Sequence, residues 1–144
     1  MITNVSLVSV WVKDIDESLA FYTDVLGFEP GDDIRMGEDF RWTTVFHPKQ
    51  PELHLHLTTP SKPLSDDLIA AMRRAQDEGG LPGVGLHVDD CRATYEDLRA
   101  KGVEFLQEPE KFLEMKHGAA DAHLQMISLM PHELVCVDWK KGQV

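Results

Sequence analysis

The sequence contains no long apolar run of the kind that forms a membrane-spanning helix. No stretch approaches the roughly 18 consecutive apolar residues that such a helix needs. Residues 1–6 also lack a basic segment followed by an apolar core, so we expect no signal peptide. We therefore expect a cytoplasmic protein that makes no membrane contact.

Cysteine is scarce as well. Cys91 and Cys136 are the only cysteines in the sequence, and they form no Cys-x-x-Cys pair. A disulfide framework needs more cysteines than this. We therefore expect reduced thiols, which fit a cytoplasmic setting.

Positive charge is also in short supply. Lys and Arg number 14 against 25 Asp and Glu, which gives a formal net charge of −11. The acidic residues lie along the whole chain and repel phosphate, so we expect no nucleic-acid partner. The sequence also lacks a glycine-rich phosphate loop, a nucleotide-binding fingerprint and the chain order of Ser, His and Asp that marks a catalytic triad. These absences argue against nucleotide-binding and serine-hydrolase functions.

The first part of the chain contains a strand followed by a helix. Residues 5–12 place alternate side chains on two faces, which predicts a strand buried on at least one side. Asp14, with Glu17 three residues later, predicts the start of a helix, and Gly27 predicts its end. Three further strands are expected near residues 28–36, 40–46 and 52–58. The predicted order is therefore βαβββ.

The second half of the chain repeats this pattern. At an offset of 76 residues, Val12 and Asp14 align with Val88 and Asp90. A strand, a capping Asp, a helix and a terminal glycine, Gly102, then follow in the same order. Such a repeat predicts two similar modules but names no function.

The boundary between the halves is expected in a crossover whose helix begins after Ser65. We assign residues 1–59 to a first βαβββ module, 60–82 to a crossover helix and linker, and 83–144 to a second βαβββ module, together forming one domain. Two interpretations of the chain end stay open. Residues 123–130 and 134–139 both form strands, or the last core strand ends at residue 130 and a tail follows.

Two segments carry a resemblance to a known family. Residues 8–30, VSVWVKDIDESLAFYTDVLGFEP, resemble the opening module of the vicinal oxygen chelate superfamily, which includes glyoxalases, bleomycin-resistance proteins and dioxygenases. Residues 84–109, VGLHVDDCRATYEDLRAKGVEFLQEP, resemble its second module. The resemblance implies an α+β fold in which two pseudo-repeated βαβββ modules form a curled, cup-shaped mixed sheet around a cavity. It also implies a homodimer.

The resemblance further indicates where metal-dependent members hold their ion. The first ligand, usually His, falls on Leu7 here, and its counterpart in the second module falls on Gly83. Neither residue offers a ligand atom from its side chain. Glu52 matches a glutamate ligand of glyoxalases, whereas the final ligand falls on Glu133 or near Ser128, without the Asp-Pro-x-Gly-Asn turn that usually precedes it. We therefore expect no cofactor at the usual family site.

Histidines nevertheless gather near the expected cavity. Because a strand alternates its faces, Glu52, His54 and His56 should point the same way. His87 should point toward the same cavity, and His123 is a further candidate. These residues suit a displaced divalent metal such as zinc, nickel, manganese or iron, or proton transfer near neutral pH. The alternative is that these are ordinary hydrogen-bonded histidines.

Three functional hypotheses follow. The leading one is a small-molecule-binding, bleomycin-resistance-like protein with a metal-free cavity for a small organic ligand. Its binding residues would be Leu7, Ser9, Trp11, His54, His56 and His87. Trp11 would either stack on a planar ligand or be a core aromatic residue. Arg41 would either pair with a ligand carboxylate or lie on the surface.

The second hypothesis is a divalent-metal-dependent lyase, isomerase or dioxygenase that uses Glu52, His54, His56 or His87. The third is a domain with a decayed site and a structural role.

Overall fold

The structure is a computed structural model that describes residues 1–37, 40–78, 81, 83–111, 124–130 and 133–139, with side chains as far as residue 105. The chain divides into two compact units, Met1–Leu81 and Pro82–Val144. Each unit contains its own four-stranded sheet. In the part of the chain that the structure describes, no helix is long and apolar enough to cross a membrane.

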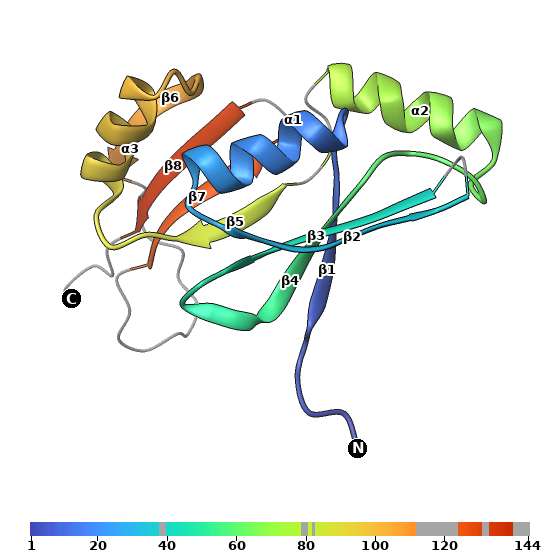
Figure 1. Cartoon of the computed structure of the whole chain (residues 1–144). Coiled ribbons are helices and arrows are strands. Elements are labelled where there is room, and N and C mark those ends of the chain that lie inside the picture. Colours follow the sequence, from blue (N-terminus) through green and yellow to red (C-terminus); the bar gives the residue numbers. More distant parts are fainter. Residues whose placement is uncertain (38–39, 79–80, 82, 112–123, 131–132, 140–144) are drawn as a thin grey trace. The chain divides into compact units, whose positions relative to one another are not determined.

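The first unit is a βαβββ module followed by a helix (Figure 1). Its elements are β1 (Leu7–Trp11), α1 (Ile15–Ala20), a π-helical turn η1 (Phe21–Val25), β2 (Glu29–Met36), β3 (Phe40–His47), β4 (Gln50–Thr58) and α2 (Asp66–Asp77). The sheet order is β1-β4-β3-β2, with β1 parallel to β4 and the other pairs antiparallel. This curled, unclosed sheet confirms the predicted mixed α+β fold.

The predicted helix caps have clear physical causes. The side chain of Asp14 accepts a hydrogen bond from the Glu17 amide at 2.9 Å, which satisfies one free donor of the first turn. Gly27 ends the helical segment with φ of 76°, a conformation that a side chain would strain. The helix is not uniform, because its second half widens into the π-helical turn at Phe21.

The core of the first unit lies on the side of the sheet that faces α1. Val45 and Leu57 are fully buried there, and Leu55 is nearly so. Burying each such side chain stabilises the fold by about 1.5–3 kcal/mol. Tyr22 from the helical turn meets Phe28 edge to face at 5.3 Å, and burial raises the pKa of its hydroxyl. These contacts fix the helix against the sheet.

The second unit has the same element order but a different sheet order. It contains β5 (Val84–His87), α3 (Cys91–Ala100), β6 (Phe105–Lys111), β7 (Leu124–Met130) and β8 (Glu133–Trp139). The strands are ordered β5-β7-β8-β6, so the first strand of this unit pairs antiparallel with β7 rather than parallel with the last strand. The repeat in sequence thus predicts the elements and not their pairing. The interpretation of residues after 130 as a tail is wrong.

The expectation of reduced thiols is also wrong. Cys91 is 1% exposed and disulfide-bonded in the structure. The only other cysteine of the sequence, Cys136, belongs to β8, and α3 packs against β8. A separation of 45 residues in sequence (136 − 91) gives no hint of this proximity, which the fold of the second unit creates.

Candidate functional site

The candidate site is the face of the first sheet that points away from α1. Arg41 of β3 reaches Asp16 of α1 at 2.7 Å, so the side chains of β3 that alternate with Arg41 lie on the opposite face. Strand register extends this face across the sheet, because Leu7 and Phe46 lie level with His54. We call this surface the histidine face, defined by Leu7, Ser9, Trp11, Trp42, Thr44, Phe46, His54, His56 and Thr58.

His56 lies at the centre of the histidine face. Its ring stacks on Trp42 with centroids 4.2 Å apart and planes inclined by 22°. Its Nδ1 lies 3.4 Å from the Ser9 hydroxyl, whereas its Nε2 is buried without a hydrogen-bond partner. Burial lowers the pKa of His56, so the neutral ring is favoured. A buried polar atom without a partner is uncommon and marks a place where a ligand atom would be stabilised.

His54 is held by a second set of contacts. Its ring stacks on Phe46 at a centroid distance of 5.2 Å, and its Nδ1 lies 3.3 Å from the Thr44 hydroxyl. That hydroxyl accepts a hydrogen bond from the Asp32 amide at 2.9 Å, so its own proton can be donated to the ring. The two histidines are therefore oriented by hydroxyl groups and aromatic rings rather than exposed at random.

Gly31 lies directly beside this arrangement. A Cβ atom at this position would collide with the Thr44 hydroxyl and lie 3.2 Å from the His54 Nδ1 atom. The absence of a side chain at Gly31 therefore lets β2 approach Thr44 and His54 closely.

The sequence analysis did not identify four residues of this site, Gly31, Trp42, Thr44 and Phe46. The alternation of β3 was the available signal, because its even-numbered residues share a face.

The remaining residues predicted to bind a ligand are placed as follows. Trp11 is half-buried and lies level with Thr58 in β4, whereas Ser9 is exposed. Leu7 is 37% exposed, so the position of the usual family ligand presents an apolar side chain to the surroundings. His87 is exposed and belongs to the second unit, so its predicted position beside His54 stays a prediction.

The structure places two of the positions at which metal-dependent members of the family hold an ion. Leu7 offers no ligand atom, and Glu52 is exposed two residues before His54. Within the described ranges, no group of three or more His, Cys, Asp or Glu side chains is placed to hold an ion. The metal ligands predicted from sequence, Glu52, His54, His56 and His87, therefore remain a prediction.

Arg41 lies on the α1 side of the sheet, where it is already engaged. Its Nε and Nη2 atoms donate to the two carboxylate oxygens of Asp33 at 2.7 and 2.8 Å, and Nη1 donates to Asp16. This fork holds the pKa of Asp33 at about 2, mainly through the hydrogen bond from Arg41. The same contacts raise the pKa of Arg41. Arg41 thus braces β2, β3 and α1, and three of its five N–H donors are already engaged with carboxylates of this chain.

The first unit is thus a curled βαβββ sheet with aromatic and imidazole side chains on one face. Residues 4–117 match the family model described as the Glyoxalase/Bleomycin resistance protein/Dioxygenase superfamily. The chain therefore belongs to this superfamily, which confirms the family that the sequence resembles.

Solved structures and a curated protein are also similar to this chain. The crystal structure of UcmS2 is 33% identical with a TM-score of 0.75, and the match covers 96% of this chain and 98% of that one. TnmS3, an antibiotic binding protein from Streptomyces sp. CB03234, shares the fold at 21% identity with a TM-score of 0.58, covering 97% and 98% of the two chains. The mitochondrial methylmalonyl-CoA epimerase of Bos taurus is 31% identical over 72% of this chain and 57% of its own length.

Proposed function

We propose that this protein binds a small, planar organic ligand on its histidine face without a resident metal. One observation carries the proposal: His56 is stacked on Trp42, and its buried Nε2 atom lacks a partner. A flat ligand can extend this stack, while a polar ligand atom hydrogen-bonds to the imidazole. The fold's use in the antibiotic binding protein TnmS3 supports a ligand of this kind.

The chemistry of the face sets limits on the ligand. Burial lowers the pKa of His56, so the imidazole is mostly neutral at neutral pH. A neutral ring has one donor and one acceptor nitrogen, which suits a phenol, amide or heterocyclic nitrogen better than a dianion. Leu7 and Phe46 add apolar contacts on either side of His54. The proposal includes the homodimer expected from sequence. The cytoplasmic location expected from sequence stays a prediction, and the disulfide of Cys91 argues against it.

Isothermal titration calorimetry with bleomycin and with naphthalene and acridine derivatives tests the proposal. We expect binding by at least one of these compounds, and a roughly tenfold weaker affinity for Trp42→Ala because one stacking surface is lost. Leu68→Ala is the matched control, since Leu68 is an exposed residue of α2. Failure of every compound to bind, or equal affinity of Trp42→Ala and Leu68→Ala, would contradict the proposal.

A metal-dependent lyase, isomerase or dioxygenase is the second candidate. The similarity to an epimerase, which is an isomerase by name, favours it, together with the imidazoles of His54 and His56. Elemental analysis after incubation with zinc, nickel, manganese or iron distinguishes the candidates. About one bound ion per chain, lost in His54→Ala or His87→Ala, would support the enzyme. Protein that takes up neither metal nor organic ligand would instead indicate a structural role.

A further inference from the structure

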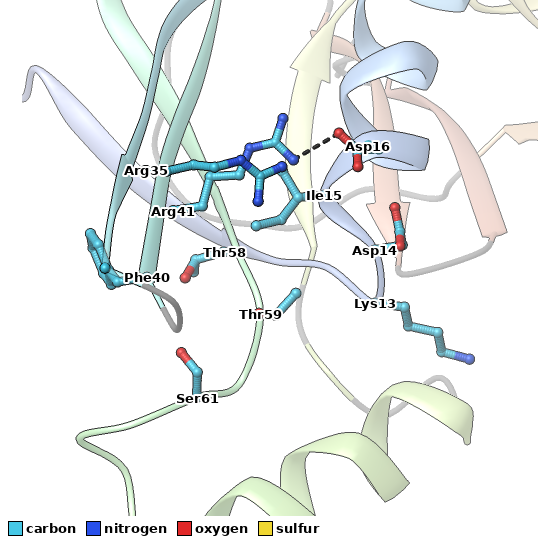
Figure 2. A pocket seen from close by; sticks show the side chains of 11 residues that line it. Lys13, Asp14, Ile15, Asp16, Arg35, Phe40, Arg41, Thr58, Thr59 and Ser61 are labelled. Carbon is cyan, nitrogen blue, oxygen red and sulfur yellow. Dashed lines mark hydrogen bonds and ion pairs between the residues drawn. The ribbon is translucent and has the colours of Figure 1, made fainter.

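A pocket of about 270 Å³ lies in the first unit, apart from the stacked histidines (Figure 2). It is formed where β1 and β4 end, beside the start of α1 and the turn between β2 and β3. Its walls combine basic, hydroxyl and apolar side chains with the carboxylates of Asp14 and Asp16. The lining residues used below are Lys13, Arg35, Phe40, Arg41, Thr58, Thr59 and Ser61.

The positive charges of this pocket differ in how they are compensated. Lys13 pairs with Asp77 at 2.8 Å, and Arg41 pairs with Asp33 and Asp16. Arg35 lies directly opposite Arg41 in the pairing of β2 with β3, and Figure 2 shows the two guanidinium groups next to each other. Among the described residues, Arg35 has no hydrogen bond or ion pair.

Arg35 thus faces a second arginine and, among the residues that the structure describes, bonds to no acid. Two like charges opposite each other across a strand pair repel, and the acids that compensate Arg41 are already occupied by it. The carboxylate of Asp14 is also engaged, because it caps α1. Asp33 attracts Arg35 electrostatically, so the Arg35 charge is partly balanced, but no described residue occupies its N–H donors, which an added anion would bind.

The rest of the pocket indicates which anion fits. The guanidinium fork matches a carboxylate through two parallel hydrogen bonds. Thr58, Thr59 and Ser61 bring three hydroxyl groups to the wall, and Phe40 adds an aromatic side chain that is 38% exposed. A volume of about 270 Å³ lies just below the usual range for drug-sized ligands, so the ligand must be small.

We propose that this pocket is a second binding site, which takes a small organic monocarboxylate with Arg35 as its main ligand-binding residue. The carboxylate pairs with Arg35 and the hydroxyl groups, and the apolar part of the ligand lies against Phe40. Thr58 is shared with the histidine face, whereas Arg35 and Phe40 are not among the residues of that face, so binding at Arg35 can be tested separately.

Benzoate is a suitable probe, and benzamide is its uncharged counterpart. Titration of the full chain followed by ¹H–¹⁵N NMR should shift the amide signals of Thr59 and Ser61 with benzoate, and at least about tenfold more weakly with benzamide. Arg35→Gln should reduce benzoate affinity by a similar factor. Arg35→Lys should restore part of it, because the charge returns without the fork.

Arg73→Gln is the matched control, since it removes the same charge from an exposed position on α2 that does not line the pocket. The NMR spectrum itself shows whether each variant is folded. Equal binding of benzoate and benzamide, equal loss in Arg35→Gln and Arg73→Gln, or benzoate shifts confined to other residues would overturn the proposal. Retained binding of aromatic ligands by Arg35→Gln would show that the two sites are separate.

Discussion

Trp42 and His56 lie face to face on neighbouring antiparallel strands, with ring centroids 4.2 Å apart. The indole covers one face of the imidazole, and His56 is only 7% exposed, although it lies on the face of the sheet away from α1. Burial lowers the pKa of the imidazole from its ordinary value of 6.5. The indole therefore supplies a stacking surface at the candidate site, and we expect it to contribute to the burial that lowers this pKa.

Removing the indole should raise the pKa of His56. In Trp42→Ala the ring gains access to water, and the desolvation that lowers its pKa is reduced. We expect an NMR titration of the His56 Cε1–H signal to show a pKa below 6.5 in the wild-type protein and a value closer to 6.5 in the variant. Phe46→Ala, which exposes His54 instead, should leave His56 unchanged. An unaltered His56 titration in Trp42→Ala would show that other groups cause the burial.

The imidazole of His56 should also make the free energy of unfolding depend on pH. Its pKa is lower in the folded chain than in the unfolded chain, so the unfolded chain binds a proton first as the pH falls. The free energy of unfolding should therefore be higher above pH 6.5 and should decrease as the pH falls from 6.5 through the folded-state pKa. Urea denaturation of the wild type and of His56→Gln at pH 7.5 and 5.5 measures this. The decrease should be smaller in the variant, and an equal decrease would assign it to other groups.

Asp33 should affect stability at a lower pH. Arg41 holds its pKa at about 2, below the ordinary value of 3.8, so its contribution is present above pH 3.8 and is lost as the pH falls through 2. We expect Asp33→Asn to destabilise the protein at pH 7 and to weaken its pH dependence between 3.8 and 2. The effect should be modest because the Asp33 side chain is 46% exposed. Asp32→Asn is a neighbouring control, and equal effects of the two substitutions would contradict the role of the Arg41 fork.

The sequence predicted the fold better than the details of the site. Period-two alternation and capping residues sufficed for the βαβββ order, because these signals are local. The partners of His54 and His56 depend on the register of β3 against β4, which shifts between Phe46 and His47. An irregularity of this kind is not visible in a hydrophobic pattern. The pairing of β5 with β7 was missed for a related reason, since the repeat predicts elements and not long-range strand contacts.

Gly31 provides a test of the packing around His54. A methyl group at this position meets the Thr44 hydroxyl within contact distance, so we expect Gly31→Ala to lower the free energy of unfolding by about 1–3 kcal/mol. Thr44→Ala removes the obstructing hydroxyl, and the double variant should be more stable than the sum of the two single effects predicts. Denaturation curves of the four proteins measure the coupling. Additive effects would show that Gly31 and Thr44 do not meet.

The disulfide of Cys91 leads to a prediction about redox state. The intact mass of protein purified without reductant should be lower by two hydrogens than that of the reduced protein.

Cys91→Ser should destabilise the chain by about 2–4 kcal/mol under oxidising conditions. The loss should be smaller under reducing conditions, because the reduced wild-type protein has already lost the cross-link. Thr94→Ala on the same helix is a control for α3, whose first residue is Cys91. Free thiols in protein kept under oxidising conditions would contradict the bond. A stable bond would count against a reducing compartment such as the cytoplasm, where disulfides are uncommon.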